Sequence, residues 1–239
     1  MDPSSPTRTN RPLIAELGWS DFLERFTLRQ GEHVALIGPT GRGKTTLALQ
    51  LLPRIPYVAV MATKPRDPVL DELRDQGFRK LPSWSVPDAE LTPRVTIAPP
   101  LPKGADSLPA QRDAFKGALD GIFRQGGWTV FADELRYLTH HLKLEREIEL
   151  LYEQGRSLGV SMISGVQRPR NVPLLAYDQA THLFFFRNAD EQSVGRLGEI
   201  TGGAIDSSIV RRGIELLHSH RVLYVNPVHE ELAITEVEL

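Results

Sequence analysis

A short glycine-rich segment of this chain has the residue types and the spacing that bind phosphate. It consists of Gly38, Pro39, Thr40, Gly41, Arg42, Gly43, Lys44, Thr45 and Thr46. The segment fits the pattern G-x-x-x-x-G-K-[ST], in which glycines let backbone N–H groups point inward at a phosphate. Lys44 would reach the β- and γ-phosphates, and the hydroxyl of Thr45 can hold Mg²⁺. These residues therefore predict a site for a nucleotide with magnesium.

The residues on both sides of this loop supply the context that the pattern requires. Residues 34–37 are apolar, as a buried strand should be, and residues 47–52 favour a helix that ends at Pro53. The alternative is a fortuitous glycine-rich turn. The order strand, glycine loop, helix disfavours that alternative, because a phosphate-binding loop needs this order.

A second informative segment covers residues 128–134, where a largely apolar run ends in Asp133 and Glu134. In phosphate-loop NTPases such a strand lies near the loop, and its terminal aspartate helps to hold Mg²⁺. A second acid directly after it can orient and deprotonate a water that attacks the γ-phosphate. The simpler interpretation, acidic residues that cap a helix, is common for an isolated strand. The upstream phosphate loop favours the catalytic interpretation.

Two further polar residues flank a buried strand expected at residues 160–166. Gln167 follows this strand, where an amide would lie beside the γ-phosphate, between the loop and the acid pair. From the strand alone, a surface loop residue is the better interpretation of Gln167. Arg156 follows a helix expected at residues 145–154, and a lone arginine in that place is more often solvated or ion-paired than catalytic.

The remaining pattern predicts one α/β domain over residues 13–239, preceded by a flexible tail at residues 1–12. Short strands are expected at residues 26–29, 32–37, 57–62, 94–98, 182–187, 221–225 and 232–235. Helices are expected at residues 13–23, 68–77, 107–124, 190–200 and 207–218. Strands that alternate with helices indicate a mostly parallel central sheet flanked by helices.

Composition limits the classes of function. The 239 residues carry a net charge of −2, so any nucleic-acid binding must come from a local basic face. There is no cysteine, no long apolar run and no apolar leader at the polar, proline-rich start, which predicts a cytoplasmic protein without a membrane span. His140 and His141 suggest a metal site. A surface pair on a helix, with Glu145 one turn later, is the better interpretation because a third ligand is not evident.

Taken together, the segments GPTGRGKTT, FADE and GRSLGVSMISGVQRPRNVP resemble the FtsK/HerA group of phosphate-loop ATPases. These are ring-forming motors that pump DNA, and they include conjugation ATPases and the packaging ATPases of some viruses. Arg156, Gly159 and Gln167 match the family, as do the Arg-Pro residues after Gln167. Val166 departs from the Thr or Ser that precedes this glutamine in the family. The resemblance spans about residues 26–190.

The resemblance implies a RecA-like (ASCE) fold, ATP and Mg²⁺ as ligands, and a role for each matching residue. Lys44 and Thr45 resemble nucleotide-binding positions, Thr45 and Asp133 the magnesium ligands, and Glu134 the residue that activates water. Gln167 resembles the sensor of the γ-phosphate. Arg156 resembles the arginine finger that acts on ATP held by the next subunit, with Arg168 and Arg170 as rivals.

The same resemblance implies partners. We expect a homo-oligomeric ring, a hexamer, that moves double-stranded DNA without sequence preference and docks on a portal or pore. The small size is most similar to phage and virus packaging ATPases, which would act in the host cytoplasm, and conjugative or mobile-element DNA transfer is the second choice. Pore candidates are the basic residues Lys64, Arg66, Arg79, Lys80 and Lys103, although solvated surface charges are the simpler interpretation of each.

Four other functions compete with this one. A protein-remodelling ATPase without DNA would share the same loop. A small-molecule kinase is disfavoured because Asp133 and Glu134 suit attack by water. An ABC-type subunit is disfavoured because no LSGGQ-like segment follows the loop. A non-enzymatic switch would not need a residue such as Glu134.

Overall fold

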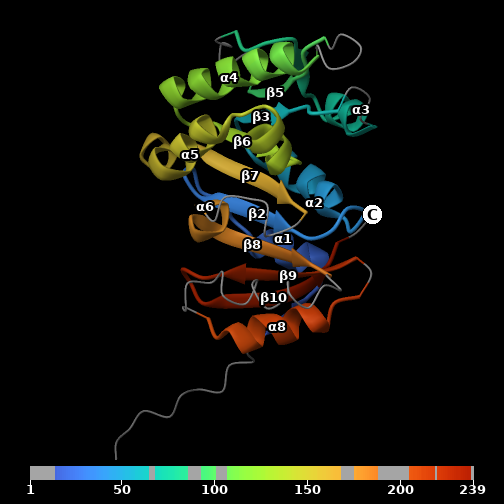
Figure 1. Ribbon diagram of the computed structural model, residues 1–239. Helices are drawn as coiled ribbons and strands as arrows, with labels where there is room; N and C mark the ends of the chain where they lie inside the picture. The colour runs from blue at the N-terminus through green and yellow to red at the C-terminus, as the bar shows by residue number, and fades with distance from the viewer. Residues whose placement is uncertain are drawn as a thin grey trace, which may run out of the picture.

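The structure is a computed structural model that describes residues 14–64, 68–85, 93–100, 107–167, 175–187, 205–218 and 220–237. Its centre is a ten-stranded sheet in the order β1-β10-β9-β8-β2-β7-β6-β3-β5-β4 (Figure 1). The strands are β1 (Ala15–Leu17), β2 (His33–Ile37), β3 (Val58–Met61), β4 (Arg79–Leu81), β5 (Arg94–Ile97), β6 (Thr129–Ala132), β7 (Ser161–Val166), β8 (Ala180–Phe186), β9 (Arg221–Asn226) and β10 (Glu231–Glu236).

Most neighbouring strands are parallel, and the exceptions lie on one side of the sheet. β8 and β9 pair antiparallel, as do β9 and β10, while β1 returns parallel to β10. From β8 through β2, β7, β6, β3 and β5 to β4 all pairs are parallel. The predicted α/β fold with a mostly parallel sheet is thus confirmed.

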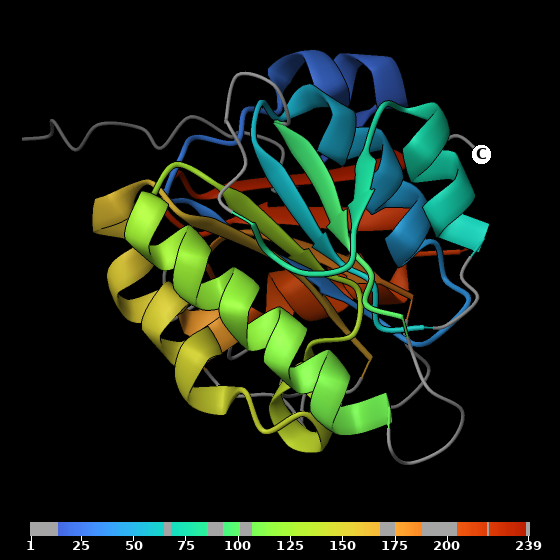
Figure 2. The same ribbon diagram turned by 90° about the horizontal axis from the view of Figure 1, so that it is seen from above.

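Helices cover both faces of the sheet, so that the domain has three layers (Figure 2). The helices are α1 (Trp19–Arg25), α2 (Lys44–Leu51), α3 (Pro68–Asp75), α4 (Ser107–Gln125), α5 (Glu145–Gln154), α6 (Leu175–Asp178) and α8 (Ser207–Glu215). One core contains residues of α1, α2 and α3, and the other contains residues of α4, α5, α6 and α8.

The central strand β2 contributes residues to both hydrophobic cores. Its residues are all buried, with Val34 and Leu36 in the core under α1 and α2, and Ala35 and Ile37 in the opposite core. Side chains of a strand alternate between faces, so a strand covered on both sides must be continuously apolar. This is why β2, β3, β6 and β7 read as short apolar runs.

Two predictions near the N-terminus are wrong. The helix expected at residues 13–23 is instead a short strand, β1, followed by α1, which ends at Arg25. Residues 26–29 form no strand; Phe26 packs against the rings of His182, Phe184 and Tyr224. Phe26 is apolar because it packs into the core, not because it belongs to a strand of the sheet.

Other differences concern the ends of elements and the limits of the described residues. The helix expected at residues 207–218 ends at Glu215. His140 and His141 end a π-helical turn, Tyr137–His141, and α5 begins only at Glu145, so these residues do not share one helix. The tail at residues 1–12 and the helix expected at 190–200 lie outside the described residues.

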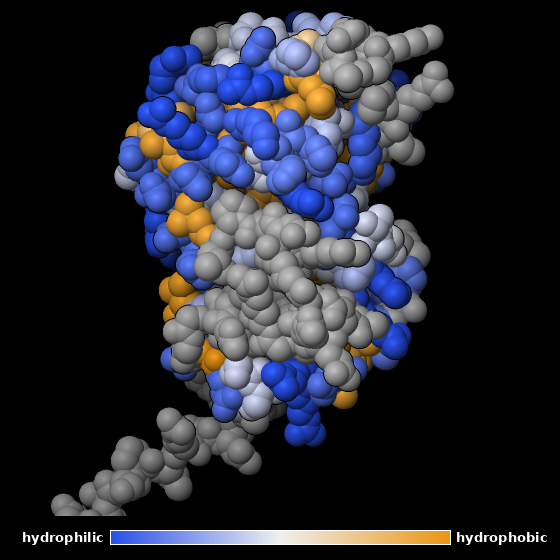
Figure 3. Space-filling view, in the orientation of Figure 1, coloured by the Kyte–Doolittle hydropathy of each residue, from blue (hydrophilic) through white to orange (hydrophobic). Residues whose placement is uncertain are grey.

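The described surface carries no large apolar face. Leu108, Leu158, Leu216 and Val228 are its exposed large apolar residues, and they come from four separate segments. The view in Figure 3 is mainly hydrophilic over the described residues, with scattered apolar side chains. Among the described residues, no helix is long and apolar enough to cross a membrane.

Candidate functional site

The glycine-rich loop connects the end of β2 to the start of α2, at the carboxyl edge of the parallel strands. Gly43 adopts a left-handed conformation (φ 96°) directly before Lys44, the first residue of α2. Glycine adopts this conformation without strain, and it lets the loop turn into the helix. The loop is also tied to the neighbouring strand, since the N–H of Gly38 donates to the carbonyl of Val166 (2.9 Å).

The side chain of Lys44 lies inside the phosphate loop. Its ammonium donates to the carbonyl oxygens of Gly38 (2.6 Å) and Pro39 (2.8 Å), and the side chain is buried. Burial lowers the pKa of Lys44 below its ordinary value, while the carboxylates of Asp133 and Glu134 act in the opposite direction. An anion placed in the loop would offset the cost of burying this charge, so the geometry favours phosphate binding.

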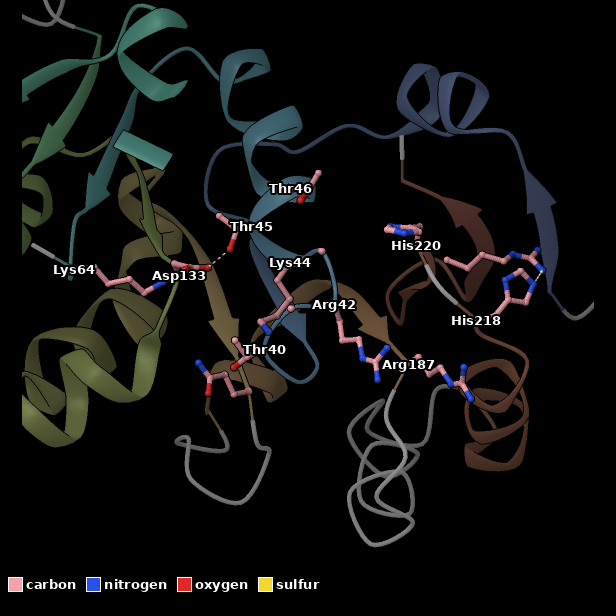
Figure 4. Close-up of a pocket in the computed structure, with 14 residues that line it drawn as sticks. Thr40, Arg42, Lys44, Thr45, Thr46, Lys64, Asp133, Arg187, His218 and His220 are labelled. Carbon is pink, nitrogen blue, oxygen red and sulfur yellow. Dashed lines mark hydrogen bonds and ion pairs between the residues drawn. The ribbon is translucent and has the colours of Figure 1, made fainter. Parts of the chain in front are cut away.

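The acid pair follows β6, and Asp133 reaches the phosphate loop. The hydroxyl of Thr45 donates to Asp133 Oδ1 at 2.9 Å (Figure 4). A hydroxyl and a carboxylate that converge are the hard oxygen donors that magnesium uses together with substrate phosphates. Thr45 and Asp133 therefore fit a magnesium ion. Elsewhere, no group of three or more His, Cys, Asp or Glu residues that could hold a metal occurs among the described residues, His140 and His141 included.

Glu134 and Gln167 lie at different positions relative to Thr45 and Asp133. Gln167 follows β7, which lies between β2 and β6, and its side chain lines the same cavity as Lys44 and Asp133. Glu134 is half-buried and does not line that cavity. Its charge nevertheless acts on Lys44, because it opposes the lowering of the Lys44 pKa. Glu134 thus lies within electrostatic reach of the phosphate loop.

Arg156 lies at the amino ends of the parallel strands, opposite to the ends that carry the phosphate loop. It belongs to a 3₁₀ turn before β7, and its backbone packs against Gly31, just before β2 begins. The six residues of β7 separate it from the edge that carries Gln167, which is roughly 20 Å at strand spacing. Arg156 is exposed and cannot reach the phosphate loop of its own chain. Arg168 and Arg170 lie outside the described residues.

The cavity extends beyond the residues that the sequence indicated. Its volume is about 370 Å³, and it runs along residues 40–46 from Lys64, Asp133 and Gln167 to a second group of side chains. This second group consists of Arg187, His218, His220 and Arg221. Figure 4 shows Lys64 and Asp133 on one side of the loop, and Arg42 and Arg187 on the other. One end of the cavity can hold metal and phosphate, and the other offers positive charge.

The position of Asp133 depends on a glycine in the neighbouring strand. A Cβ atom at Gly165 of β7 would lie 1.9 Å from the carbonyl oxygen of Asp133. The carbonyl oxygen is a main-chain atom and a Cβ atom is fixed by its own backbone, so neither can rotate away. The close approach of β6 and β7 thus requires glycine at this point.

We therefore expect Gly165→Ala to lower the free energy of unfolding by about 3 kcal/mol, the upper end of the usual range for overpacking. Chemical denaturation followed by circular dichroism would measure the change. Gly117→Ala is the matched control, because a Cβ atom there meets nothing within 4 Å and the site lies in helix α4. The control should gain about 0.5–1 kcal/mol. Equal stability of Gly165→Ala and wild type would contradict the close contact.

Comparison with solved structures identifies the fold. No protein-family model and no curated protein matches the sequence. The genome packaging NTPase B204 from Sulfolobus turreted icosahedral virus 2, in complex with ATP-gammaS, superposes with a TM-score of 0.63 at 17% identity. The match covers 89% of this chain and 100% of that one.

Two larger proteins contain the same fold. EssC (ATPases 2 and 3) from Geobacillus thermodenitrificans matches with a TM-score of 0.57 at 13% identity, over 90% of this chain and 40% of that one. The cytoplasmic domain of the Type VII secretion ATPase EccC from Thermomonospora curvata matches with a TM-score of 0.56 at 15% identity, over 87% of this chain and 25% of that one. This chain has the fold of these P-loop ATPases, the fold that its resemblance to the FtsK/HerA group predicted.

Proposed function

We propose that this chain is an ATP-hydrolysing ring motor that translocates DNA, and that its task is to package the genome of a phage or virus. The observation that carries the proposal is the convergence of Lys44, Thr45, Asp133 and Gln167 in one cavity. Residues 13–239 would act as one ATPase domain, since a single sheet includes strands from Ala15 to Glu236.

The proposed chemistry assigns each step to a side chain. Lys44 and the loop N–H groups bind the phosphates of ATP, and Gln167 contacts the terminal phosphate. Thr45 and Asp133 would hold a magnesium ion, which would supply positive charge next to the triphosphate. Glu134 orients a water and takes its proton as the water attacks the γ-phosphate. Arg156 of the neighbouring subunit would stabilise the charge that develops there.

Packaging is favoured over the alternatives by the extent of the structural match. The chain covers the whole length of a protein described as a genome packaging NTPase. It covers only 40% of the EssC chain with ATPases 2 and 3, and 25% of the cytoplasmic domain of the secretion ATPase EccC. A protein-remodelling or secretion ATPase that does not act on DNA is the second candidate, because EssC and EccC share the fold. Conjugative or mobile-element DNA transfer would use the same DNA-translocating mechanism as packaging. It would differ in the docking partner, which would be a pore and not a portal.

The test is ATP hydrolysis with and without long double-stranded DNA, at low and moderate salt. A hexameric motor in the host cytoplasm that grips the DNA backbone without sequence preference should be stimulated by DNA. This stimulation should weaken as salt rises, because salt competes for the phosphate contacts. Hydrolysis that is indifferent to DNA at every salt concentration would exclude the motor and favour the protein-remodelling alternative.

Glu134→Gln should reduce ATP turnover by about 10²-fold or more, the usual contribution of a general base. The amide keeps the shape of the side chain but cannot accept the proton, so ATP should still bind. Steady-state hydrolysis and binding of a fluorescent ATP analogue measure the two effects separately. Glu149→Gln on the exposed face of α5 is the control. Wild-type turnover in Glu134→Gln would assign the base to another residue.

A further inference from the structure

Lys64 makes a contact that its position in the sequence does not predict. It lies just beyond β3, and its Nζ atom lies 3.3 Å from Asp133 Oδ2. The other carboxylate oxygen, Oδ1, accepts a hydrogen bond from the hydroxyl of Thr45. Figure 4 shows the side chain of Lys64 extending toward Asp133. The carboxylate that fits magnesium is thus shared between the phosphate loop and a second lysine.

Buried hydrogen bonds fix the backbone next to Lys64. The amide of Gln111, on α4 and fully buried, donates to the carbonyl oxygens of Thr63 (3.1 Å) and Ala62 (3.4 Å). The oxygen of the same amide accepts a hydrogen bond from the hydroxyl of Tyr137 (2.6 Å). The N–H of Tyr137 in turn donates to the carbonyl of Glu134 (3.0 Å). One side chain therefore holds the segment before Lys64 against the turn that carries both acids.

The charges around Asp133 indicate what Lys64 does when the site is loaded. Asp133 is the one carboxylate among the described residues that line the cavity, whereas Lys44 and Lys64 both bring ammonium groups to it. A divalent metal on Asp133 would repel a neighbouring ammonium group. A lysine has a flexible stem with three rotatable donors, so its charge can shift to a nearby anion. The terminal phosphate of a bound triphosphate is such an anion.

We propose that Lys64 is a second phosphate lysine, which neutralises Asp133 and moves to the terminal phosphate of ATP when Thr45 and Asp133 hold magnesium. The inference rests on the proposed ATPase function and assigns Lys64 to that site, not to a DNA pore. Lys64 then has two effects. It competes with a divalent metal for Asp133 before ATP binds, and it favours ATP over ADP afterwards.

The test compares Lys64→Met with wild type and uses Lys80→Met as control, since Lys80 is an exposed lysine on β4. The first measurement is calorimetric binding of ATPγS and of ADP, both with Mg²⁺. The preference for ATPγS over ADP should fall about tenfold, as expected for loss of one charge-assisted contact. The ratio is used because any effect on the metal is common to both nucleotides.

The second measurement is Mn²⁺ binding without nucleotide, followed by electron paramagnetic resonance. Mn²⁺ should bind more tightly to Lys64→Met, because a competing cation is gone, while Lys80→Met should match wild type. Lys64→Arg, which keeps the charge, should restore most of the preference for ATPγS.

Each result decides one part of the proposal. An unchanged ratio of ATPγS to ADP affinity in Lys64→Met overturns the phosphate contact, and an unchanged Mn²⁺ affinity overturns the competition for Asp133. No step of this test uses DNA, so a failure of the DNA motor would leave it interpretable. If wild type bound neither nucleotide, the proposed ATPase function itself would be refuted.

Discussion

Replacing Lys44 with alanine is expected to abolish ATP hydrolysis, with a loss of about 10³-fold or more in turnover, because the buried ammonium stabilises charge on the transferring phosphoryl group. Lys44 is buried and donates hydrogen bonds to the loop carbonyl oxygens of Gly38 and Pro39. Alanine removes both the charge and these two hydrogen bonds.

Hydrolysis measured by phosphate release would establish the loss, with circular dichroism to verify that the variant is folded. Lys80→Ala on the exposed strand β4 removes the same charge away from the cavity and should hydrolyse ATP as wild type does. Normal turnover in Lys44→Ala would end the assignment of residues 38–46 as the ATP site.

Arg156→Ala is expected to lower turnover by about 10³-fold, the smaller end of the range for an arginine finger, and to leave ATP binding intact. If the proposal is right, the geometry requires that turnover falls while ATP binding is unchanged. Arg156 lies at the amino edge of β7 and the phosphate loop at the carboxyl edge, so the guanidinium can act only on ATP held by another subunit.

Mixing variants separates an action between subunits from a general defect. In a mixture of Arg156→Ala with Glu134→Gln, some interfaces would combine an intact Glu134 with an intact Arg156, and activity should exceed that of either variant alone. Arg146→Ala on the exposed face of α5 is the control and should be active by itself. Absence of any gain on mixing, with ring assembly intact, would assign the finger elsewhere.

The phosphate loop and the strands that frame it could be predicted because their signals are local. β2, the glycines and α2 follow one another within a short segment, and a buried parallel strand reads as an apolar run. The same reasoning predicts β6 and β7, which are also apolar runs followed by polar residues. Of these polar residues, Asp133 and Gln167 line the cavity. The placement of β7 between β2 and β6 is what brings Gln167 to the phosphate loop.

The first errors arose where distant pairing decides structure. β1 pairs with β10, more than two hundred positions away in the sequence, and its three residues carry no pattern of their own. Phe26 looks like part of a strand because it alternates with Leu28, but both are anchored to a core without any strand partner.

The far end of the cavity was missed for a related reason. Arg187 directly follows β8, and Arg221 begins β9. Because β8 and β9 run antiparallel, the end of one strand and the start of the other meet at the same edge as the phosphate loop. Arg187 did stand at the end of a predicted strand, which was a usable signal. The sequence suggests Lys64 as a DNA-pore candidate or a surface charge and does not indicate a place in the ATP site, since its contact with Asp133 depends on how β3 and β6 align.

The two outermost strands of the sheet have a consequence for how copies of this chain can join. β1 and β4 are three residues each, and Arg79 and Lys80 of β4 are both exposed. Short edges with charged side chains resist the addition of another strand, whereas a long apolar edge would invite aggregation. Arg79 and Lys80, which the sequence suggests as candidates for a DNA pore, thus also protect the edge of the described sheet at β4. Subunits of the proposed ring would have to meet through loops and helices instead of a continuous shared sheet.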